Sequence, residues 1–234
     1  MRRYLIILMM PCFVMLFGIC CLAGCEGSRH HLKKVRLNEV AHSIFYAPQY
    51  VAIEKGYFEK EGIKLELTTG FGADKTATAV ISGDADIAFM GPEATIYQFN
   101  QGNADYLINF AQLTQRAGNF VVSREREDSF KWEDLKGKKV IGGRPGGMPE
   151  MVFEYVLKKH GMNPQKDINL VQNIDFANTS GAFVSGEADY TVEFEPAATL
   201  IEEQGAGYVV ASVGKESGYV PYTAYSVKKS YLET

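Results

Sequence analysis

The sequence predicts an α/β fold of two similar lobes, in which parallel-rich sheets are flanked by helices. Segments typical of strands and of helices alternate from Val35 onward. A pattern of eight residues at 79–86 recurs at 182–189. Alternation of this kind is typical of sheets whose strands are joined through helices.

The elements of the first half follow from apolar spacing and from the positions of glycine and proline. Ile63–Thr69 alternates with a period of two, as a half-buried strand does. Pro48 and Pro92 stand where helices can begin, and Gly83 where one can end. The expected elements are a strand over 35–41, a helix from Pro48 toward Gly56 or Phe58, a strand over 63–69, a helix over 75–81, a strand over 86–90, a helix from Pro92, and strands over 107–113 and 120–123.

The second half restarts the alternation. A strand over 138–141 leads into a glycine-rich loop at 142–147, after which Pro149 opens a helix that ends near Gly161. Basic residues in its last turn suit the negative end of the helix dipole. A strand over 168–171 and a helix over 176–184 follow.

The internal repeat is the best argument for two lobes. Residues 79–86 read Ala-Val-Ile-Ser-Gly-Asp-Ala-Asp, and residues 182–189 read Ala-Phe-Val-Ser-Gly-Glu-Ala-Asp. A short apolar run and then Pro92 or Pro196 follow each copy. Chance recurrence of a common turn is the alternative. We expect lobes at 35–121 and 122–222, a return toward the first lobe at 223–234, and ligand binding between the lobes at strand ends and helix N-termini.

The N-terminal segment has the features of a secretory leader. Arg2 and Arg3 precede an almost unbroken apolar run, which ends in Leu22-Ala23-Gly24-Cys25. This ending resembles the lipobox of bacterial lipoproteins, which implies cleavage after residue 24, a lipid on Cys25 and a polar tether over 25–34. A transmembrane anchor is the alternative, because about 20 apolar residues can span a bilayer. We expect a protein held on the outer face of the bacterial cell membrane.

Composition excludes several classes of function. The net charge is −4, or about −6 once residues 1–24 are removed, so the chain lacks the basic footprint of a nucleic-acid-binding protein. All four cysteines lie at or before Cys25, which leaves the mature fold no disulfide, thiolate metal site or thiol nucleophile. The sequence also lacks G-x-S-x-G and H-E-x-x-H motifs. We therefore expect no enzyme activity, metal or cofactor.

Three motifs in order resemble the substrate-binding proteins of bacterial ABC importers, in the group of the sulfonate, nitrate and thiamine-pyrimidine binders. They are Ala47–Ile63, which contains Lys55-Gly56-Tyr57-Phe58; Ser82–Ala88; and Trp132–Val140. The resemblance implies a type II periplasmic-binding-protein-like fold, a monomer that binds a small solute, and partners in an ABC permease and its ATPase subunit. The group also contains a fungal pyrimidine synthase, whose cysteine-rich motif is absent here. Members of the group are usually longer, so we expect a C-terminal truncation.

The resemblance points to loops after strand ends as the ligand site. Arg144 in the glycine-rich loop suits an anion, whereas acids beside aromatic residues suit a ring with N–H donors. The candidate ligand-binding residues are His42, Ser43, Phe45, Tyr46, Phe71, Gly72, Met90, Gly91, Glu93, Gly143, Arg144, Gly146, Gly147, Met148, Glu193, Glu195 and Tyr222.

The predicted function is capture of a solute for import, with a lean toward a nitrogen heterocycle such as the thiamine pyrimidine. A sulfonate, taurine or nitrate binder is the alternative within the same group. An exported enzyme using paired carboxylates, and a ligand sensor for a signalling partner, are the alternatives outside transport.

Overall fold

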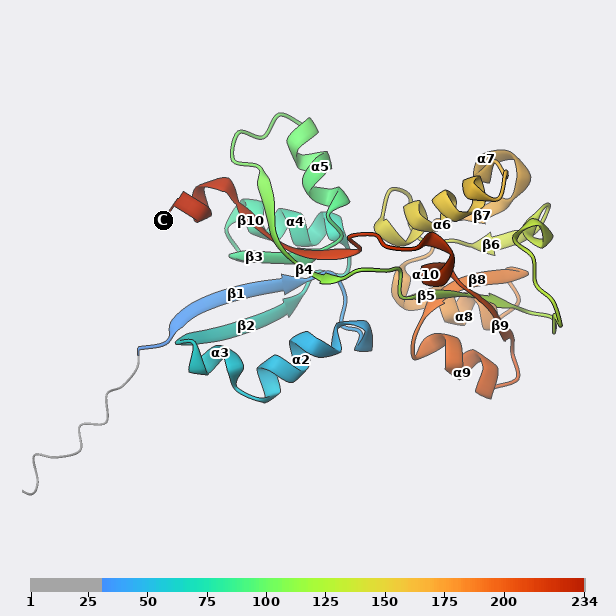
Figure 1. The fold of residues 1–234 in the computed structure, drawn as a ribbon, viewed down its shortest axis with the longest axis horizontal. Helices are drawn as coiled ribbons and strands as arrows, with labels where there is room; N and C mark the ends of the chain where they lie inside the picture. The colour runs from blue at the N-terminus through green and yellow to red at the C-terminus, as the bar shows by residue number, and fades with distance from the viewer. Residues whose placement is uncertain (1–30, 234) are drawn as a thin grey trace, which may run out of the picture. The chain divides into compact units, whose positions relative to one another are not determined.

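Two five-stranded sheets, each flanked by helices, form the fold in a computed structural model that describes residues 31–233 (Figure 1). The strand orders are β2-β1-β3-β10-β4 and β7-β6-β8-β5-β9. The predicted α/β class, with two sheets flanked by helices, is thereby confirmed. The leader, Cys25 and most of the tether lie outside the described residues. No helix within residues 31–233 is long and apolar enough to cross a membrane.

The first sheet contains most of the elements expected in the first half. Its strands, in chain order, are β1 (Lys33–Glu39), β2 (Ile63–Thr69), β3 (Ile87–Met90), β4 (Leu107–Thr114) and β10 (Thr223–Lys228). The helices of this half are η1 (Ile44–Tyr46), α2 (Ala47–Glu54), α3 (Tyr57–Lys60), α4 (Ala73–Ser82) and α5 (Glu93–Asn100), and η4 (Lys229–Glu233) follows β10.

The second sheet repeats the plan with shorter strands. Its strands are β5 (Asn119–Ser123), β6 (Lys139–Ile141), β7 (Asn169–Val171), β8 (Tyr190–Phe194) and β9 (Tyr208–Ser212). The helices are η2 (Trp132–Leu135), α6 (Met148–Lys159), α7 (Pro164–Asp167), η3 (Phe176–Asn178), α8 (Thr179–Val184), α9 (Ala197–Glu203) and α10 (Val213–Ser217). The helix expected over 176–184 is therefore a 3-10 turn followed by α8.

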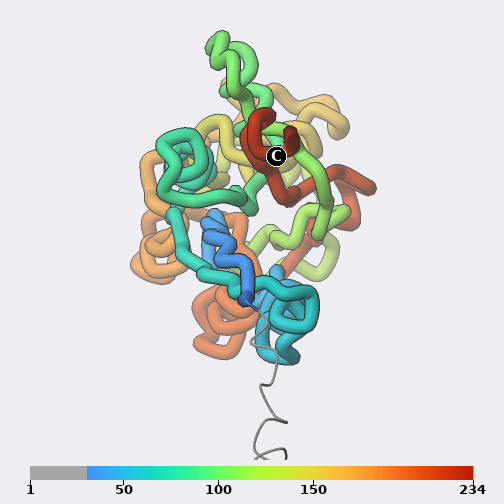
Figure 2. The backbone as a smooth tube through the Cα atoms, turned by 90° about the vertical axis from the view of Figure 1, so that its left-hand side faces the viewer, coloured from blue at the N-terminus to red at the C-terminus, as the bar shows by residue number. Residues whose placement is uncertain are grey.

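Both sheets are mixed rather than largely parallel. Strand β3 pairs in parallel with β1, and β8 pairs in parallel with β6. On the other side of each central strand runs an antiparallel neighbour, β10 beside β3 and β5 beside β8. These neighbours come from the other half of the sequence, and Figures 1 and 2 show the red strand β10 beside the green strand β4. The antiparallel strands arise because the chain crosses from one sheet to the other and returns.

The repeated sequence forms the same elements in both halves. Helices α4 and α8 are followed by Gly83 and Gly186, which have positive φ values of 87° and 97°. The next strand is the central one of each sheet. Asp86 then accepts a hydrogen bond from the Arg36 backbone, as Asp189 does from Lys139, at 2.8 Å in both cases.

Two connecting segments, 115–118 and 213–222, join the sheets and contact each other. The backbone N–H groups of Val220 and Tyr222 donate to the carbonyls of Gln115 and Thr114. A Cβ on Gly214 would overlap the carbonyl of Ala117, so the two backbones approach as closely as glycine allows. The predicted boundary between 121 and 122 falls inside β5, and the division into lobes remains a proposal.

Candidate functional site

Aromatic rings from distant parts of the sequence meet beside the connecting segments. The ring of Phe45, in η1, lies 5.5 Å from that of Phe194 and 5.7 Å from that of Tyr222, measured between centroids. Phe194 and Tyr222 are themselves 6.2 Å apart. A Cβ on Gly118 would overlap the Phe45 ring, so glycine makes room for it. Phe45 therefore packs against residues of both the second sheet and the connecting segment 213–222.

Glu93 is the first residue of α5 and follows the central strand β3. Its carboxylate Oε1 accepts a hydrogen bond of 3.0 Å from the backbone N–H of Met148, the first residue of α6. A Cβ on Gly91 would overlap both carboxylate oxygens of Glu93, so the carboxylate folds back over that glycine. The contact joins a helix of the first sheet to a helix of the second.

Burial changes the acidity of Glu93 and of its neighbours. Glu93 is 4% exposed, and loss of hydration raises its pKa to about 6, although backbone N–H bonds from Glu93 and Met148 act in the opposite direction. Burial also raises the pKa of the Tyr222 hydroxyl, with smaller contributions from Tyr46 and from the negative charge of Glu93. Tyr46, Glu93 and Tyr222 therefore share one electrostatic environment.

Three buried side chains near these rings have polar atoms without a hydrogen-bond partner among the described residues. They are Oε2 of Glu93, both amide atoms of Asn119, and the hydroxyl of Tyr222. Asn119 is fully buried and pairs with Phe194 across β5 and β8. An unsatisfied buried polar group costs roughly 1–3 kcal/mol, so such groups usually serve a ligand, a water or an ion. We define the site by these three residues together with Phe45, Tyr46, Phe194 and Met148.

Arg144 and the glycine-rich loop make a second set of contacts to the first half. A guanidinium nitrogen of Arg144 lies 3.8 Å from a carboxylate oxygen of Asp74 in α4. Gly72, just before α4, has a φ of 151°, and a Cβ there would lie 3.0 Å from Arg144. The hydroxyl of Tyr97 donates to the carbonyl of Gly146 at 3.0 Å. The charge of Arg144 is therefore partly balanced by a carboxylate.

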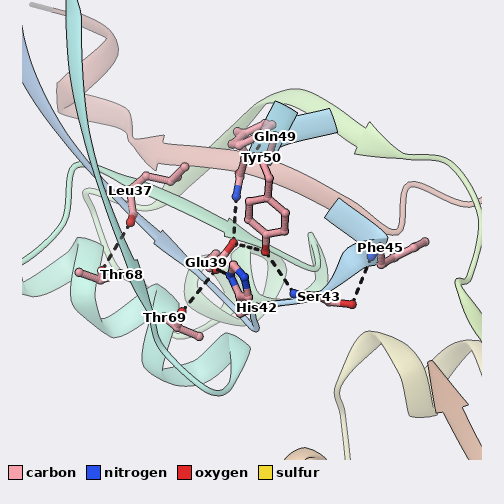
Figure 3. A network of polar contacts seen from close by, with 10 residues as sticks. Leu37, Glu39, His42, Ser43, Phe45, Gln49, Tyr50, Thr68 and Thr69 are labelled. Atoms are coloured by element: carbon pink, nitrogen blue, oxygen red, sulfur yellow. Dashed lines mark hydrogen bonds and ion pairs between the residues drawn. The ribbon is translucent and has the colours of Figure 1, made fainter. Parts of the chain in front are cut away.

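His42 belongs to a hydrogen-bond network centred on the buried Glu39 (Figure 3). A ring nitrogen of His42 lies 2.9 Å from Oε1 of Glu39, while Gln49 and Tyr50 donate to Oε2 at 2.9 Å each. Ser43 caps η1 and donates its backbone N–H to the Tyr50 hydroxyl. The network fixes the segment that presents Phe45 and Tyr46.

Other predicted residues have partners within their own half. Glu193 accepts hydrogen bonds from Thr191 at 2.7 Å and from Thr179 at 3.1 Å, and Glu195 accepts one from the backbone of Thr199 in α9. Met90 lies in the core.

The predicted loop residues differ in exposure and backbone geometry. Phe71 is largely exposed, with a φ of 58°. Gly143 has a φ of 98°, and Gly147 precedes the first residue of α6. The structure thus brings Phe45, Tyr46, Glu93, Met148 and Tyr222 together, and it pairs both oxygens of Glu193 inside the second half.

Two residues of the site, Asn119 and Phe194, are absent from the predicted ligand-binding residues, and Asn119 is the polar one. It begins a strand that reads Asn-Phe-Val-Val-Ser, and its face of β5 also carries the buried Val121. The sequence signal for Asn119 is its place directly after Gly118 and two residues before Val121, on the same face of the strand. This signal is weak. A hollow lined by η3 and α8 contains none of the site residues. No group of three or more potential metal-ligating side chains occurs within residues 31–233.

Comparison with known proteins identifies relatives of this chain. YtlA of Bacillus subtilis (strain 168), described as a candidate binding protein, is 52% identical over 222 residues, which are 95% of this chain and 66% of YtlA. The chain therefore spans just under two thirds of that relative's length.

Two solved structures share the fold. The aliphatic sulphonate binding protein SsuA from Escherichia coli matches with a TM-score of 0.66 and 19% identity, over 86% of this chain and 67% of SsuA. The nitrate-binding protein NrtA from Synechocystis PCC 6803 gives the same TM-score and identity, over 86% of this chain and 57% of NrtA. At such identity the likeness shows the fold alone. A family model described as NMT1/THI5 like matches residues 44–231, and the chain belongs to that family.

Proposed function

We propose that this protein is the solute-binding component of an ABC importer and works outside the cytoplasm. The family, the description of YtlA as a candidate binding protein and the fold shared with SsuA and NrtA support this function. The leader and the lipobox-like ending support a lipid on Cys25 and residence on the outer face of the membrane. A permease and its ATPase subunit are the implied partners of the monomer.

The observation that carries the proposal is the set of unpartnered polar atoms on Glu93, Asn119 and Tyr222. They come from α5, β5 and the segment before β10, and Glu93 also contacts α6. A solute that bonds to all three would link the two halves, as closure over a ligand requires. The adjacent rings of Phe45 and Phe194 offer apolar contact to a flat solute.

The chemistry of these groups favours a solute with hydrogen-bond donors. A carboxylate accepts only, an amide accepts and donates, and a tyrosine hydroxyl does both. A nitrogen heterocycle with N–H groups meets these requirements and could stack on the rings. Arg144 is the group that would favour a sulfonate or nitrate, but its ion pair with Asp74 weighs against that role.

Calorimetry on the unlipidated chain that begins at Glu26 tests the function. The panel contains hydroxymethyl-aminopyrimidine, thiamine, taurine, ethanesulfonate and nitrate. We expect one class to bind, unchanged after incubation, and Asn119→Ala and Tyr222→Phe to weaken it at least tenfold. Matched changes at exposed positions, Asn169→Ala and Tyr208→Phe, should leave affinity unaltered. Turnover of the bound compound, or equal affinity in all five proteins, would overturn the proposal.

The lipid anchor has a separate test. Growth of the source cells with radiolabelled palmitate should label the wild-type chain in the membrane fraction. Cys25→Ser should abolish the label and leave the precursor uncleaved. A chain that stays membrane-bound and unlabelled in both forms would instead favour the transmembrane anchor.

A further inference from the structure

The N-terminus of α6 already holds a carboxylate supplied by the other half of the chain. Helix α6 has twelve residues and no side-chain cap, and its second residue, Pro149, has no N–H to donate. The N–H of Met148 at the first position donates to Glu93. Since helix N-termini attract anions, the position that a bound anion would take is filled by the protein itself.

Glu93 has a free oxygen that points to a second role. Its Oε1 is bonded to Met148, while the buried Oε2 has no partner among the described residues. A buried acceptor of this kind can receive a hydrogen bond from a solute at small cost, because it was desolvated on folding. The described groups that share its electrostatic environment are Tyr46, Tyr97 and Tyr222, none of which is cationic.

The nearby cation, Arg144, does not offset the negative charge of Glu93. Arg144 lies three residues before the Gly147 cap of α6, and its guanidinium faces Asp74. Glu150, in the first turn of α6, adds a second carboxylate, whose Oε2 accepts from the N–H of Gly146 at 3.2 Å. Burial and the neighbouring Glu154 raise the pKa of Glu150 to about 7, so near neutral pH the negative charge at the start of α6 comes mainly from Glu93, whose pKa is about 6. A solute anion there would meet like charge at short range.

We propose that Glu93 sets the charge preference of the site: its carboxylate occupies the anion position at the start of α6 and excludes anionic solutes, while its Oε2 accepts a hydrogen bond from a neutral or cationic one. This inference rests on the proposed function, because it concerns the same solute site. It makes Glu93 a specificity residue rather than an ordinary helix-terminal acid.

Two variants separate the charge of Glu93 from its occupancy of the site. Glu93→Gln keeps an oxygen that can accept from Met148 but removes the charge. Glu93→Ala removes both, so the Met148 N–H becomes free. We therefore expect affinity for nitrate and ethanesulfonate to rise from wild type to Glu93→Gln and again to Glu93→Ala, by at least tenfold in total.

The experiment follows the backbone amide of Met148 by nuclear magnetic resonance in the mature chain while nitrate or ethanesulfonate is added in low-salt buffer. We expect no saturable shift in the wild type, and a saturable shift in Glu93→Ala. Glu203→Gln, which removes an exposed carboxylate in α9, should behave as the wild type.

Each outcome decides the inference independently of the solute. A saturable Met148 shift in the wild type, or the lack of one in Glu93→Ala with the remaining spectrum folded, would overturn it. The proposed function fails on a different result, when no solute of any charge binds or when Asn119→Ala and Tyr222→Phe have no effect. The two experiments can therefore show that Glu93 excludes anions even if the protein binds no solute.

Discussion

The two loops that follow the central strands differ although the sheets around them match. After β3 the sequence is Gly91-Pro92-Glu93, and after β8 it is Glu195-Pro196-Ala197. In the first loop the acid comes after the proline and is buried against Met148 of the other half. In the second the acid comes before the proline and caps its own helix through Thr199. The two loops are otherwise similar, but their carboxylates differ in position by two residues. The carboxylate of Glu93 therefore contacts the other half, whereas that of Glu195 stabilises its own helix.

The comparison shows that the repeat supplies the scaffold but not the site. Asp86 and Asp189 make equivalent hydrogen bonds, and Gly83 and Gly186 end equivalent helices. Glu93 has no acidic counterpart, because Ala197 occupies the equivalent first position of α9. The second sheet and its helix α6 contribute Asn119, Phe194 and the Met148 N–H instead. The site is asymmetric because each half offers different atoms to the same place.

The largest expected effect is at the glycine of the first loop. Gly91→Ala would force the Glu93 carboxylate away from Met148, because the added Cβ would overlap both carboxylate oxygens. We expect a loss of about 3 kcal/mol in the free energy of unfolding, measured by urea denaturation. At the equivalent position, Glu195→Ala should cost only about 1 kcal/mol, the value of a helix cap. Equal losses at the two positions would contradict the asymmetry.

The buried acid of the second half should show itself as a pH dependence. Burial raises the pKa of Glu193 to about 7, so the folded protein keeps a proton that the unfolded chain releases near pH 4.5. Stability contributed by this group is therefore lost as pH rises from 4.5 to 7. Glu193→Gln should be more stable than the wild type by about 2–3 kcal/mol at pH 8 and no more stable at pH 4.

Thermal unfolding at both pH values measures this difference. In Glu193→Gln the new amide can accept from Thr191 and donate to the hydroxyl of Thr179, which itself donates to the carbonyl of Phe176. The exposed Glu203→Gln is the control and should shift neither curve. A gain in Glu193→Gln that is the same at pH 4 and pH 8 would show that burial of the charge is not its cause.

Replacing Asp86 and replacing its equivalent Asp189 should lower the free energy of unfolding by amounts that differ less. Asp86 accepts hydrogen bonds from the backbone and the guanidinium of Arg36, whereas Asp189 accepts from the backbone of Lys139. We expect Asp86→Ala to cost about 2 kcal/mol and Asp189→Ala about 1 kcal/mol, because a charge-assisted pair is lost only in the first. Chemical denaturation with and without 1 M salt tests this, since only the Asp86 effect should shrink with salt.

The smallest effect is expected from making the second loop resemble the first. Ala197→Glu places a carboxylate in the first turn of α9, where the helix dipole favours it by about 0.5 kcal/mol. Solute affinity should not change, because this carboxylate would have no counterpart of Met148. A change in affinity as large as that of a Glu93 variant would mean that the two loops face the same solute.

Much of the fold could be predicted because its signals are local. Strand β2 occupies the predicted range, and α4 ends at the predicted glycine, since alternation and helix caps depend on neighbouring residues. The mixed direction of the sheets depends on where the chain crosses between them, which no local pattern records. Strands β9 and β10 accordingly lie outside the elements that the sequence predicts.

The candidate site was predictable only in part, for the same reason. Glu93 and Tyr222 are among the expected ligand residues, and the structure buries both with unpartnered atoms. Glu193 resembles Glu93 in the sequence, yet two threonine hydroxyls bond its carboxylate within the second half. The hydrogen bond from Met148 to Glu93 joins residues far apart in the chain, so it has no sequence signature.

The sequence by itself determined the family, the alternation of elements and the repeat, because these follow from residue order and local conformational preference. The tertiary structure alone decided which carboxylate meets the start of α6, which polar atoms remain unpartnered, and that Asn119 lies opposite Phe194 across β5 and β8. These properties depend on burial and on contacts between distant segments, and both arise only once the two sheets are packed beside the segments that connect them.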